Sequence, residues 1–378
     1  MTVDLYHSTS TLLTGVFDNT IVFFMETRVA YLEPGNISIE TVTLPELRSN
    51  QVLIEAHQAS VCGSERYFYR GISVKPEDEA RGGPETRLGA APEDGKPRHE
   101  YPMGPLGHEG GGTIIKKGTA AQEYLGGGRI SVGDRVASLV YPTYTDYWVT
   151  DISHVQPIPE GISFEVGCLY EPLGCAVWAA RHMGVKLGDT VAVNGVGFAR
   201  SIMLQGAVKS GASLVIAVDV VEGKLEIARD LGAHHTIRAG KDDPIKSVLE
   251  ITGGIGVDVA VEAVGGTGVG IIQALGMVRH NGTMALYGDN YQPVESFCFN
   301  RFHEDGLEIR NLNAVHFTRL QSVENMREAY VAVHRGVFDL DIIFANSDSH
   351  SLAELPRVFA EETGASNQHT SFKTIIVP

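Results

Sequence analysis

The sequence predicts an α/β protein with two domains, one rich in antiparallel strands and one built on a doubly wound parallel sheet. Its 378 residues exceed the roughly 100–150 residues that one domain usually holds. Between Arg28 and Ser60, short apolar and polar runs alternate and are broken by Pro and Gly, which indicates antiparallel strands. Beyond residue 178, strand-like and helix-like segments alternate strictly, which is typical of a parallel sheet with helices on both faces.

The elements expected in the second domain follow one another without interruption after the helical pattern of 171–186. Each apolar run of strand length is followed by a segment with apolar residues at helical spacing. The expected strands are 190–195, 213–220, 235–239, 257–264 and 282–288, and the expected helices are 201–211, 222–232, 243–253 and 271–278.

The domain limits follow from these patterns. We expect the first domain at 1–177, with an N-terminal extension at 1–24, and the parallel-sheet domain at 178–314. Residues 315–378 end in the strand-like run FKTIIVP and are expected to return to the first domain. Residues 73–104 are rich in Pro, Gly and charge, which indicates a long loop. This loop either shapes the mouth of a site or a subunit contact, or is a plain surface loop.

Composition and charge narrow the classes of protein. Hydrophobic residues make up 43% and charged residues 20%, the balance of a chain that folds throughout. The net charge of -16, without a block of Lys or Arg, argues against a nucleic-acid-binding protein. The start of the chain has no basic segment, and the apolar run 20–25 is too short to span a membrane. We expect a cytoplasmic protein that binds neither nucleic acid nor membrane.

A glycine turn follows the first strand of the second domain and predicts a dinucleotide site. Gly195 makes the tight turn, Gly197 lets the backbone approach a pyrophosphate, and Phe198 and Ala199 open the helix whose positive end faces it. Arg200 stands where the usual fingerprint has a third glycine. We expect its side chain to turn outward, with the helix shifted slightly from the sheet, and to reach the pyrophosphate or an acidic residue of the facing domain.

Asp219 ends the second strand of this domain, where an acidic side chain can bind both hydroxyls of an adenosine ribose. Lys224, in the helix that follows, completes the expected cofactor-binding set. Because no Arg follows Asp219 within 220–222, we expect NAD rather than NADP. The alternative interpretation is that Asp219 only caps the next helix.

Residues of the types that coordinate zinc come from three separate segments: Cys62, the pair His108 and Glu109, and Glu171. On composition alone, a packed cysteine, a core histidine and a glutamate at a helix start are the favoured explanation. The remaining cysteines, at positions 168, 175 and 298, are expected to pack in cores.

The motifs VCGSE (61–65), GPLGHEGGG (104–112), VGDRVA (132–137) and YEPLG (170–174), followed by the glycine turn, resemble the zinc-containing medium-chain dehydrogenase/reductase family. The resemblance is closest to the polyol branch, typified by sorbitol dehydrogenase. It implies a GroES-like catalytic domain, a Rossmann cofactor domain, and a homodimer or homotetramer assembled through the Rossmann domain. No cysteine lies between Val132 and Cys168, so one catalytic zinc per chain is expected rather than a second, structural one.

The resemblance also assigns roles to residues. Cys62, His108 and Glu109 are implied as zinc ligands, with Glu109 counted among the catalytic residues, and Glu171 as a ligand or the holder of a water. Ser64 corresponds to the hydroxyl that takes the substrate proton, and Glu65 to the carboxylate that supports the histidine ligand. A further position, often a histidine that continues the proton relay in this family, is Tyr67 here.

The function expected from the sequence is that of a zinc-dependent, NAD-linked dehydrogenase. It would interconvert a secondary alcohol of a sugar, polyol or cyclitol and its ketone by hydride transfer. Two alternatives are a zinc-free NAD(P)H-dependent enone reductase of the same fold and a non-enzymatic dinucleotide-binding protein. The retained ligand set and Ser64 argue against both.

Overall fold

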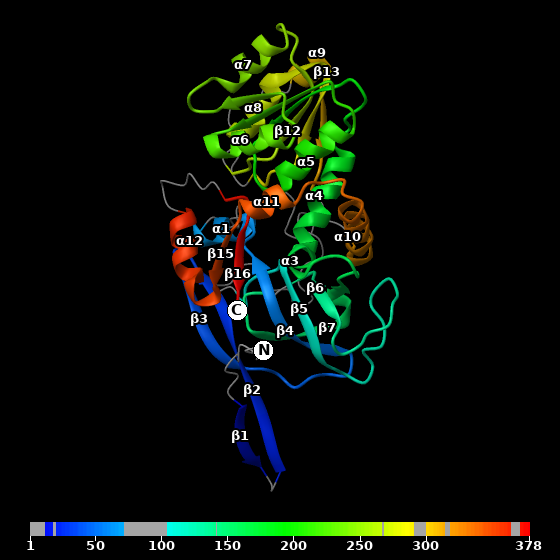
Figure 1. Ribbon diagram of the computed structural model, residues 1–378. Coiled ribbons are helices and arrows are strands. Elements are labelled where there is room, and N and C mark those ends of the chain that lie inside the picture. The colour runs from blue at the N-terminus through cyan, green and yellow to red at the C-terminus, as the bar shows by residue number, and fades with distance from the viewer. Residues whose placement is uncertain are drawn as a thin grey trace, which may run out of the picture.

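The computed structural model describes residues 12–17, 20–71, 104–140, 142–266, 268–290, 300–313, 318–363 and 371–378. Three sheets form the framework, and the parallel-sheet lobe stands at the opposite end of the molecule from the N-terminal hairpin (Figure 1). The loop expected at 73–104 lies almost wholly outside the described residues, as does Cys298, so the expectations for both stay predictions.

The N-terminal sheet is a three-stranded antiparallel meander. It consists of β1 (Leu12–Phe17), β2 (Thr20–Glu33) and β3 (Asn36–Thr43). The hairpin of β1 and the start of β2 extends away from the rest of the chain (Figure 1). Farther along β2, Ala30 and Leu32 pack with Ile37 of β3 in a buried cluster that also contains Ala59 and Ile376, which anchors this sheet to the second one.

The second sheet carries the metal-ligand candidates. Its strand order is β15-β16-β4-β5-β6-β8, and β7 pairs with β4. The elements of the first part of the chain are β4 (Gln51–Ser60), α1 (Gly63–Tyr69), β5 (Gly110–Lys117), β6 (Arg135–Ser138), β7 (Tyr147–Asp151), the 3-10 helix Ile152–His154, β8 (Val155–Pro157) and α3 (Phe164–Cys168). The next helix, α4 (Tyr170–His182), leads to the parallel-sheet lobe, and the expected boundary at residue 178 falls inside it.

The third sheet is parallel throughout, with the order β11-β10-β9-β12-β13-β14. Its strands are β9 (Thr190–Asn194), β10 (Leu214–Asp219), β11 (His235–Arg238), β12 (Val257–Glu262), β13 (Val278–Leu286) and β14 (Glu308–Asn311). Its helices are α5 (Phe198–Lys209), α6 (Glu222–Asp230), α7 (Pro244–Ile251), α8 (Val269–Met277) and α9 (Asn300–Asp305). The doubly wound fold is confirmed, and the strand order reverses beside β9. In folds of this kind, ligands bind at such a reversal, here at the carboxyl ends of β9 and β12. The sequence patterns missed β14.

The end of the chain returns to the catalytic lobe. Its elements are α10 (Arg319–His334), α11 (Asp341–Ala345), β15 (Asp348–Ser351), the 3-10 helix Leu352–Glu354, α12 (Leu355–Thr363) and β16 (Thr374–Val377). Strand β16 pairs antiparallel with β4, with Ile375 opposite Ser60. The largest buried cluster joins this returning segment, through Phe372 and Ile375, to α4, α5 and the parallel sheet. The parallel sheet and the segment that pairs with β4 therefore share one packed framework.

The part of the chain that the structure describes contains no helix long and apolar enough to cross a membrane.

Candidate active site

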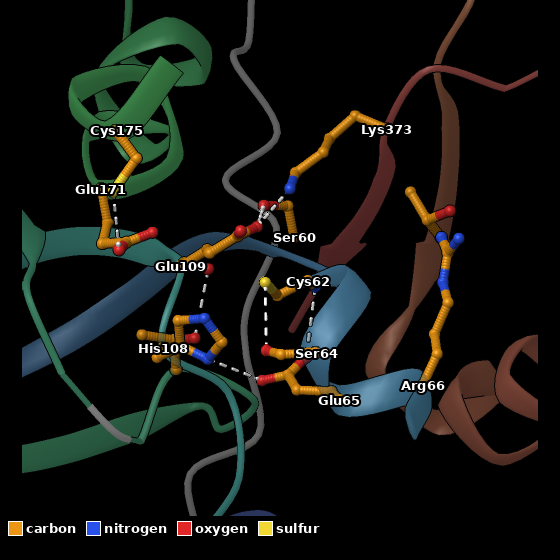
Figure 2. A network of polar contacts seen from close by, with 12 residues as sticks. Ser60, Cys62, Ser64, Glu65, Arg66, His108, Glu109, Glu171, Cys175 and Lys373 are labelled. Atoms are coloured by element: carbon orange, nitrogen blue, oxygen red, sulfur yellow. Dashed lines mark hydrogen bonds and ion pairs between the residues drawn. The ribbon is translucent and has the colours of Figure 1, made fainter. Parts of the chain in front are cut away.

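Two neighbouring strands bring three of the expected zinc ligands together. Cys62 follows the end of β4, and His108 and Glu109 precede the start of β5. Because these strands pair antiparallel, the end of one meets the start of the other, and the Ser60 N–H donates to the Glu109 carbonyl at 2.9 Å. One ligand atom each from Cys62, His108 and Glu109 lies within 4.8 Å of the others (Figure 2).

A buried carboxylate fixes the histidine of this cluster. Glu65, which has no exposed surface, places Oε1 at 3.0 Å from His108 Nδ1. Its Oε2 accepts hydrogen bonds from the Tyr144 hydroxyl at 2.5 Å and from the Cys62 backbone N–H at 3.2 Å. Since Nδ1 is used in this contact, Nε2 is the ring nitrogen that can coordinate a metal.

The charges around His108 favour a cation at the cluster. Burial alone lowers the pKa of His108, but its interactions with Cys62 and Glu65 raise it well above its usual value. The same negative charges stabilise a metal ion. A thiolate, an imidazole and a carboxylate at this spacing fit a tetrahedral zinc whose fourth position is open.

Glu109 has a partner that the sequence patterns missed. Its buried carboxylate lies 2.5 Å from Lys373 Nζ and accepts a hydrogen bond from the Ser60 hydroxyl, also at 2.5 Å. Burial by itself raises the pKa of Glu109. The charges of Lys373 and then His108 outweigh burial and lower this pKa, so the carboxylate is held ionised. Lys373 Nζ also lies 5.3 Å from the ring centre of Phe198, at the start of α5. The only sequence signal was a lysine inside the apolar run FKTIIVP, since lysines are almost never buried unless they are paired.

Glu171, on α4, lies outside the group of three (Figure 2). Its Oε1 accepts a hydrogen bond from the Cys175 thiol at 3.4 Å, and burial raises the pKa of Glu171. Both side chains line a cavity of about 380 Å³ that also reaches His108. The expectation that Cys175 only packs in a core is therefore wrong, whereas Cys168 is fully buried in a hydrophobic cluster, as expected.

Ser64 and Tyr67, the two residues expected to move the proton, contact different parts of the protein. The Ser64 hydroxyl donates to Cys62 Sγ at 3.3 Å, which places it beside the cluster. Tyr67 lies against the cofactor lobe, where a Cβ atom added at Gly265 would be 3.1 Å from its Oη. Burial raises the pKa of Tyr67.

The glycine turn has the geometry expected of a phosphate site. Gly195 has a φ of 97°, a conformation that favours glycine, and Gly197 caps α5. The Arg200 guanidinium turns back over this turn, and a Cβ atom added at Gly197 would lie 2.8 Å from its Nη1. Arg200 donates to the carbonyl oxygen of Ala263 and, at 3.4 Å, to that of Val264. The side chain thus lies over the glycine turn, and its described hydrogen bonds go to carbonyl oxygens of its own domain rather than to acidic residues of the facing one.

Asp219 binds the turn. Its Oδ2 accepts from the Val196 N–H at 2.7 Å and its Oδ1 from the Val221 N–H at 2.9 Å. Lys224 lies close by, and its pKa is lowered by burial and by the charge of Arg200, although Asp219 raises it.

The cofactor region contains one residue that the sequence patterns missed, Arg238, and two that they identified, Phe198 and Ala199. Arg238, opposite Asp219 on the neighbouring strand β11, was not identified from the sequence; its Nη1 lies 3.9 Å from Glu222 Oε2. Phe198 is buried, whereas Ala199 is half-buried.

Comparison with known proteins finds similar chains among zinc-type dehydrogenases. The zinc-binding dehydrogenase family matches residues 195–331. A sorbitol dehydrogenase from Bacillus subtilis (strain 168) is 27% identical over 275 residues, which cover 67% of this chain and 72% of the relative.

Solved structures share the fold. A 2R,3R-butanediol dehydrogenase from Bacillus subtilis superposes with a TM-score of 0.72 at 20% identity, covering 93% of this chain and 99% of the other. A mycobacterial protein complexed with NADPH gives a TM-score of 0.72 at 22% identity, covering 93% and 100%. The chain thus resembles the zinc-type dehydrogenases of the medium-chain dehydrogenase/reductase superfamily, near the sorbitol dehydrogenase branch.

Proposed function

We propose that this chain is a zinc-dependent, NAD-linked dehydrogenase that oxidises a secondary alcohol of a sugar, polyol or cyclitol to its ketone. The observation that carries the proposal is the cluster of Cys62, His108 and Glu109 beside the Ser64 hydroxyl. A cavity lined by His108 adjoins this cluster, and the adjoining lobe has the strand-order reversal at which dinucleotides bind in doubly wound folds.

Each residue of the proposed site has its own role in the reaction. When bound, zinc supplies Lewis acidity that lowers the pKa of a hydroxyl, and the nicotinamide accepts the hydride. Cys62, His108 and Glu109 hold the metal, and Glu171 orients a water or a substrate hydroxyl. Ser64 Oγ receives the substrate proton, and Tyr67 is the proposed next member of the relay. Glu65 keeps His108 in one ring orientation.

The preference for NAD rests on Asp219, whose carboxylate would repel a 2'-phosphate. Arg238 on the neighbouring strand is a guanidinium that could oppose this preference, and its Nη1 lies 3.9 Å from Glu222 Oε2. A lower KM for NADP than for NAD, abolished in Arg238→Ala, would show that this guanidinium decides the cofactor instead.

Retention of the zinc-ligand types separates this proposal from a zinc-free enone reductase of the same fold. The discriminating experiment is metal analysis of the purified protein, followed by an NAD-reduction screen over polyols, cyclitols, aldoses and simple alcohols. We expect one zinc per chain, and loss of zinc and activity together in Cys62→Ala. Two zinc ions per chain, or full activity in Cys62→Ala, would remove the basis of the mechanism.

The proposed assembly is a homodimer or homotetramer that forms through the cofactor lobe. Strand β14 ends the described parallel sheet, and its Ile309 is 45% exposed. Light scattering on the wild type and on Ile309→Glu tests this assembly, and a smaller particle is expected for the variant. A cytoplasmic location also remains a prediction.

A further inference from the structure

We propose that the cavity beside the candidate metal cluster selects a polyhydroxylated substrate with a terminal anionic group, a carboxylate or a phosphate, and that Arg319 binds this group. The inference rests on the proposed function, because it assumes that the reacting hydroxyl faces the end of the cavity formed by His108 and Glu171. It adds the chemical class of the substrate.

The cavity has two walls of different chemistry. His108, Glu171 and Cys175 line one side, and α10 lines the other with Arg319, Ser322, Asn325 and Met326. Its volume of about 380 Å³ lies within the range typical of small-molecule sites, about 300–1,000 Å³. Part of the lining is apolar, from Leu139, Val140 and Met326, which suits the carbon skeleton of a sugar-like molecule.

The polar groups of α10 share one helix face. Arg319, Ser322 and Asn325 are spaced three residues apart, which places them on successive turns of the same side. Met326 is 4% exposed and packs so tightly on α4 that a Cβ atom added at Gly174 would lie 2.6 Å from its Cγ. This contact holds the helix against the metal side of the cavity.

Both ends of α10 are fixed as well. Thr318 and Gln321 form a capping box at its start. Near its other end the Tyr330 ring stacks on Tyr170, with ring centres 4.2 Å apart, and its hydroxyl donates to the Gly167 carbonyl at 3.1 Å. Arg319 is therefore presented from a rigid element.

The cavity wall offers polar groups that a ligand can use. Within the described ranges, no carboxylate oxygen lies within 4.0 Å of the Arg319 guanidinium, and the Asn325 amide makes no hydrogen bond to protein. Ser322 donates to the Thr318 carbonyl at 3.3 Å and keeps its acceptor capacity. The wall therefore offers a guanidinium, an amide and a hydroxyl to a ligand.

Asp151 is an acidic residue whose pKa the charge of Arg319 lowers, but its carboxylate is bound by other groups. Burial raises the pKa of Asp151, and its hydrogen bonds with Ser153 lower it more strongly than the charge of Arg319 does. The Asp151 carboxylate accepts the Ser153 N–H at 2.9 Å. A neutral polyol would satisfy Asn325 and Ser322 but give Arg319 no counter-charge, whereas a carboxylate or phosphate can bind a guanidinium through two parallel hydrogen bonds.

The test compares a hexitol, the matching hexonate and the hexitol phosphate as substrates for NAD reduction by the zinc-loaded protein. We expect the wild type to have the higher kcat/KM for an anionic compound. In Arg319→Gln the ratio of anionic to neutral kcat/KM should fall about 10- to 100-fold, as expected for loss of a charge-assisted bidentate contact. Arg335→Gln, at the exposed C-cap of the same helix, is the matched control and should keep the wild-type ratio. The anion that is preferred separates carboxylate from phosphate.

A binding measurement separates this inference from the proposed function. Calorimetric titration of the hexonate and of the hexitol phosphate into the protein should give affinities that fall with added salt and weaken in Arg319→Gln. Arg319-dependent binding without oxidation of any compound would support the inference and overturn the proposed function. Oxidation of the hexitol with equal or better efficiency, or an Arg319→Gln variant with the wild-type ratio, would overturn the inference and leave the function standing.

Discussion

Single side chains set the properties of the candidate metal site, and Glu65 is the clearest case. One buried carboxylate serves His108, Tyr144 and the Cys62 backbone N–H. It therefore fixes the ring of His108, one proposed ligand. It also fixes the start of helix α1, which follows Cys62, another proposed ligand. Such supporting carboxylates typically contribute 10- to 100-fold to metal affinity.

Glu65→Gln should weaken zinc binding by about 10- to 100-fold, because the amide keeps the shape of the side chain but loses the charge that holds His108. Competition with a chelator of known affinity measures the effect. Glu46→Gln, at an exposed position of the same domain, is the control and should bind zinc like the wild type. An unchanged affinity in Glu65→Gln would show that the imidazole is oriented by other contacts.

Arg200 offers a second test at this scale, because its guanidinium lies over the turn where a pyrophosphate would sit. On binding, it would exchange the Ala263 and Val264 carbonyl oxygens for phosphate oxygens. Arg200→Ala should raise the Kd and the KM for NAD about 10- to 100-fold, as expected for lost charged hydrogen bonds. The Tm should change little, because the side chain is half-exposed.

Fluorescence titration with NAD and thermal denaturation together decide among the roles of Arg200. A lower Tm with unchanged NAD affinity would assign it to domain packing. No change in either quantity would make it a tolerated surface residue. Arg48→Ala, at an exposed position, is the control for removing a positive charge.

At the scale of elements, Asp258 joins the starts of two neighbouring strands of the parallel sheet. Its carboxylate accepts hydrogen bonds from the backbone N–H and the hydroxyl of Thr190, both at 2.8 Å, and pairs with Arg279 at 2.6 Å. Burial raises the pKa of Asp258, but the bonds to Thr190 and Arg279 lower it more. The ionised carboxylate therefore stabilises the β9 and β12 pair.

Asp258→Asn should lower the free energy of unfolding at pH 7 by about 1–3 kcal/mol. The pKa of Asp258 is lower in the folded than in the unfolded protein. The stabilisation by its carboxylate is therefore fully present above the usual Asp pKa of about 3.9, and it is lost as the pH falls through the folded-state pKa. The difference between wild type and variant should thus shrink below about pH 4. Urea unfolding at several pH values measures it, with Asp230→Asn, an exposed position, as control. A difference that grows in acid would contradict this sign.

At the scale of the whole molecule, Lys373 connects the returning chain end to both lobes. It pairs with Glu109 before β5 and lies over Phe198 at the start of α5. Removing one partner of a buried ion pair usually costs about 3–5 kcal/mol, because the other charge is left without compensation.

Lys373→Met should therefore lower the stability of the metal-free protein by a few kcal/mol. Zinc should reduce this loss, because its charge compensates Glu109 when the lysine is absent. Thermal unfolding of both proteins with zinc and with a chelator checks the expectation. The double variant Lys373→Met, Glu109→Gln should recover part of the stability without metal. An equal loss with and without zinc would show that Glu109 does not face the metal.

The sequence by itself determined the alternation of strands and helices, the glycine turn at Gly195 and Gly197, and the resemblance to a known family. These are local patterns: side-chain periodicity and turn chemistry are set within a few residues, so they can be read along the chain. The order of the ligand motifs added the candidate metal site through resemblance.

The tertiary structure alone decided which side chains meet. It paired Glu109 with Lys373, placed Arg238 opposite Asp219, turned Cys175 towards Glu171, and added β14 as the sixth strand. The physical reason is that a buried charge requires a partner but does not specify where along the chain that partner lies. Strand register and helix packing supply that information, and both depend on contacts between residues that are far apart in the sequence.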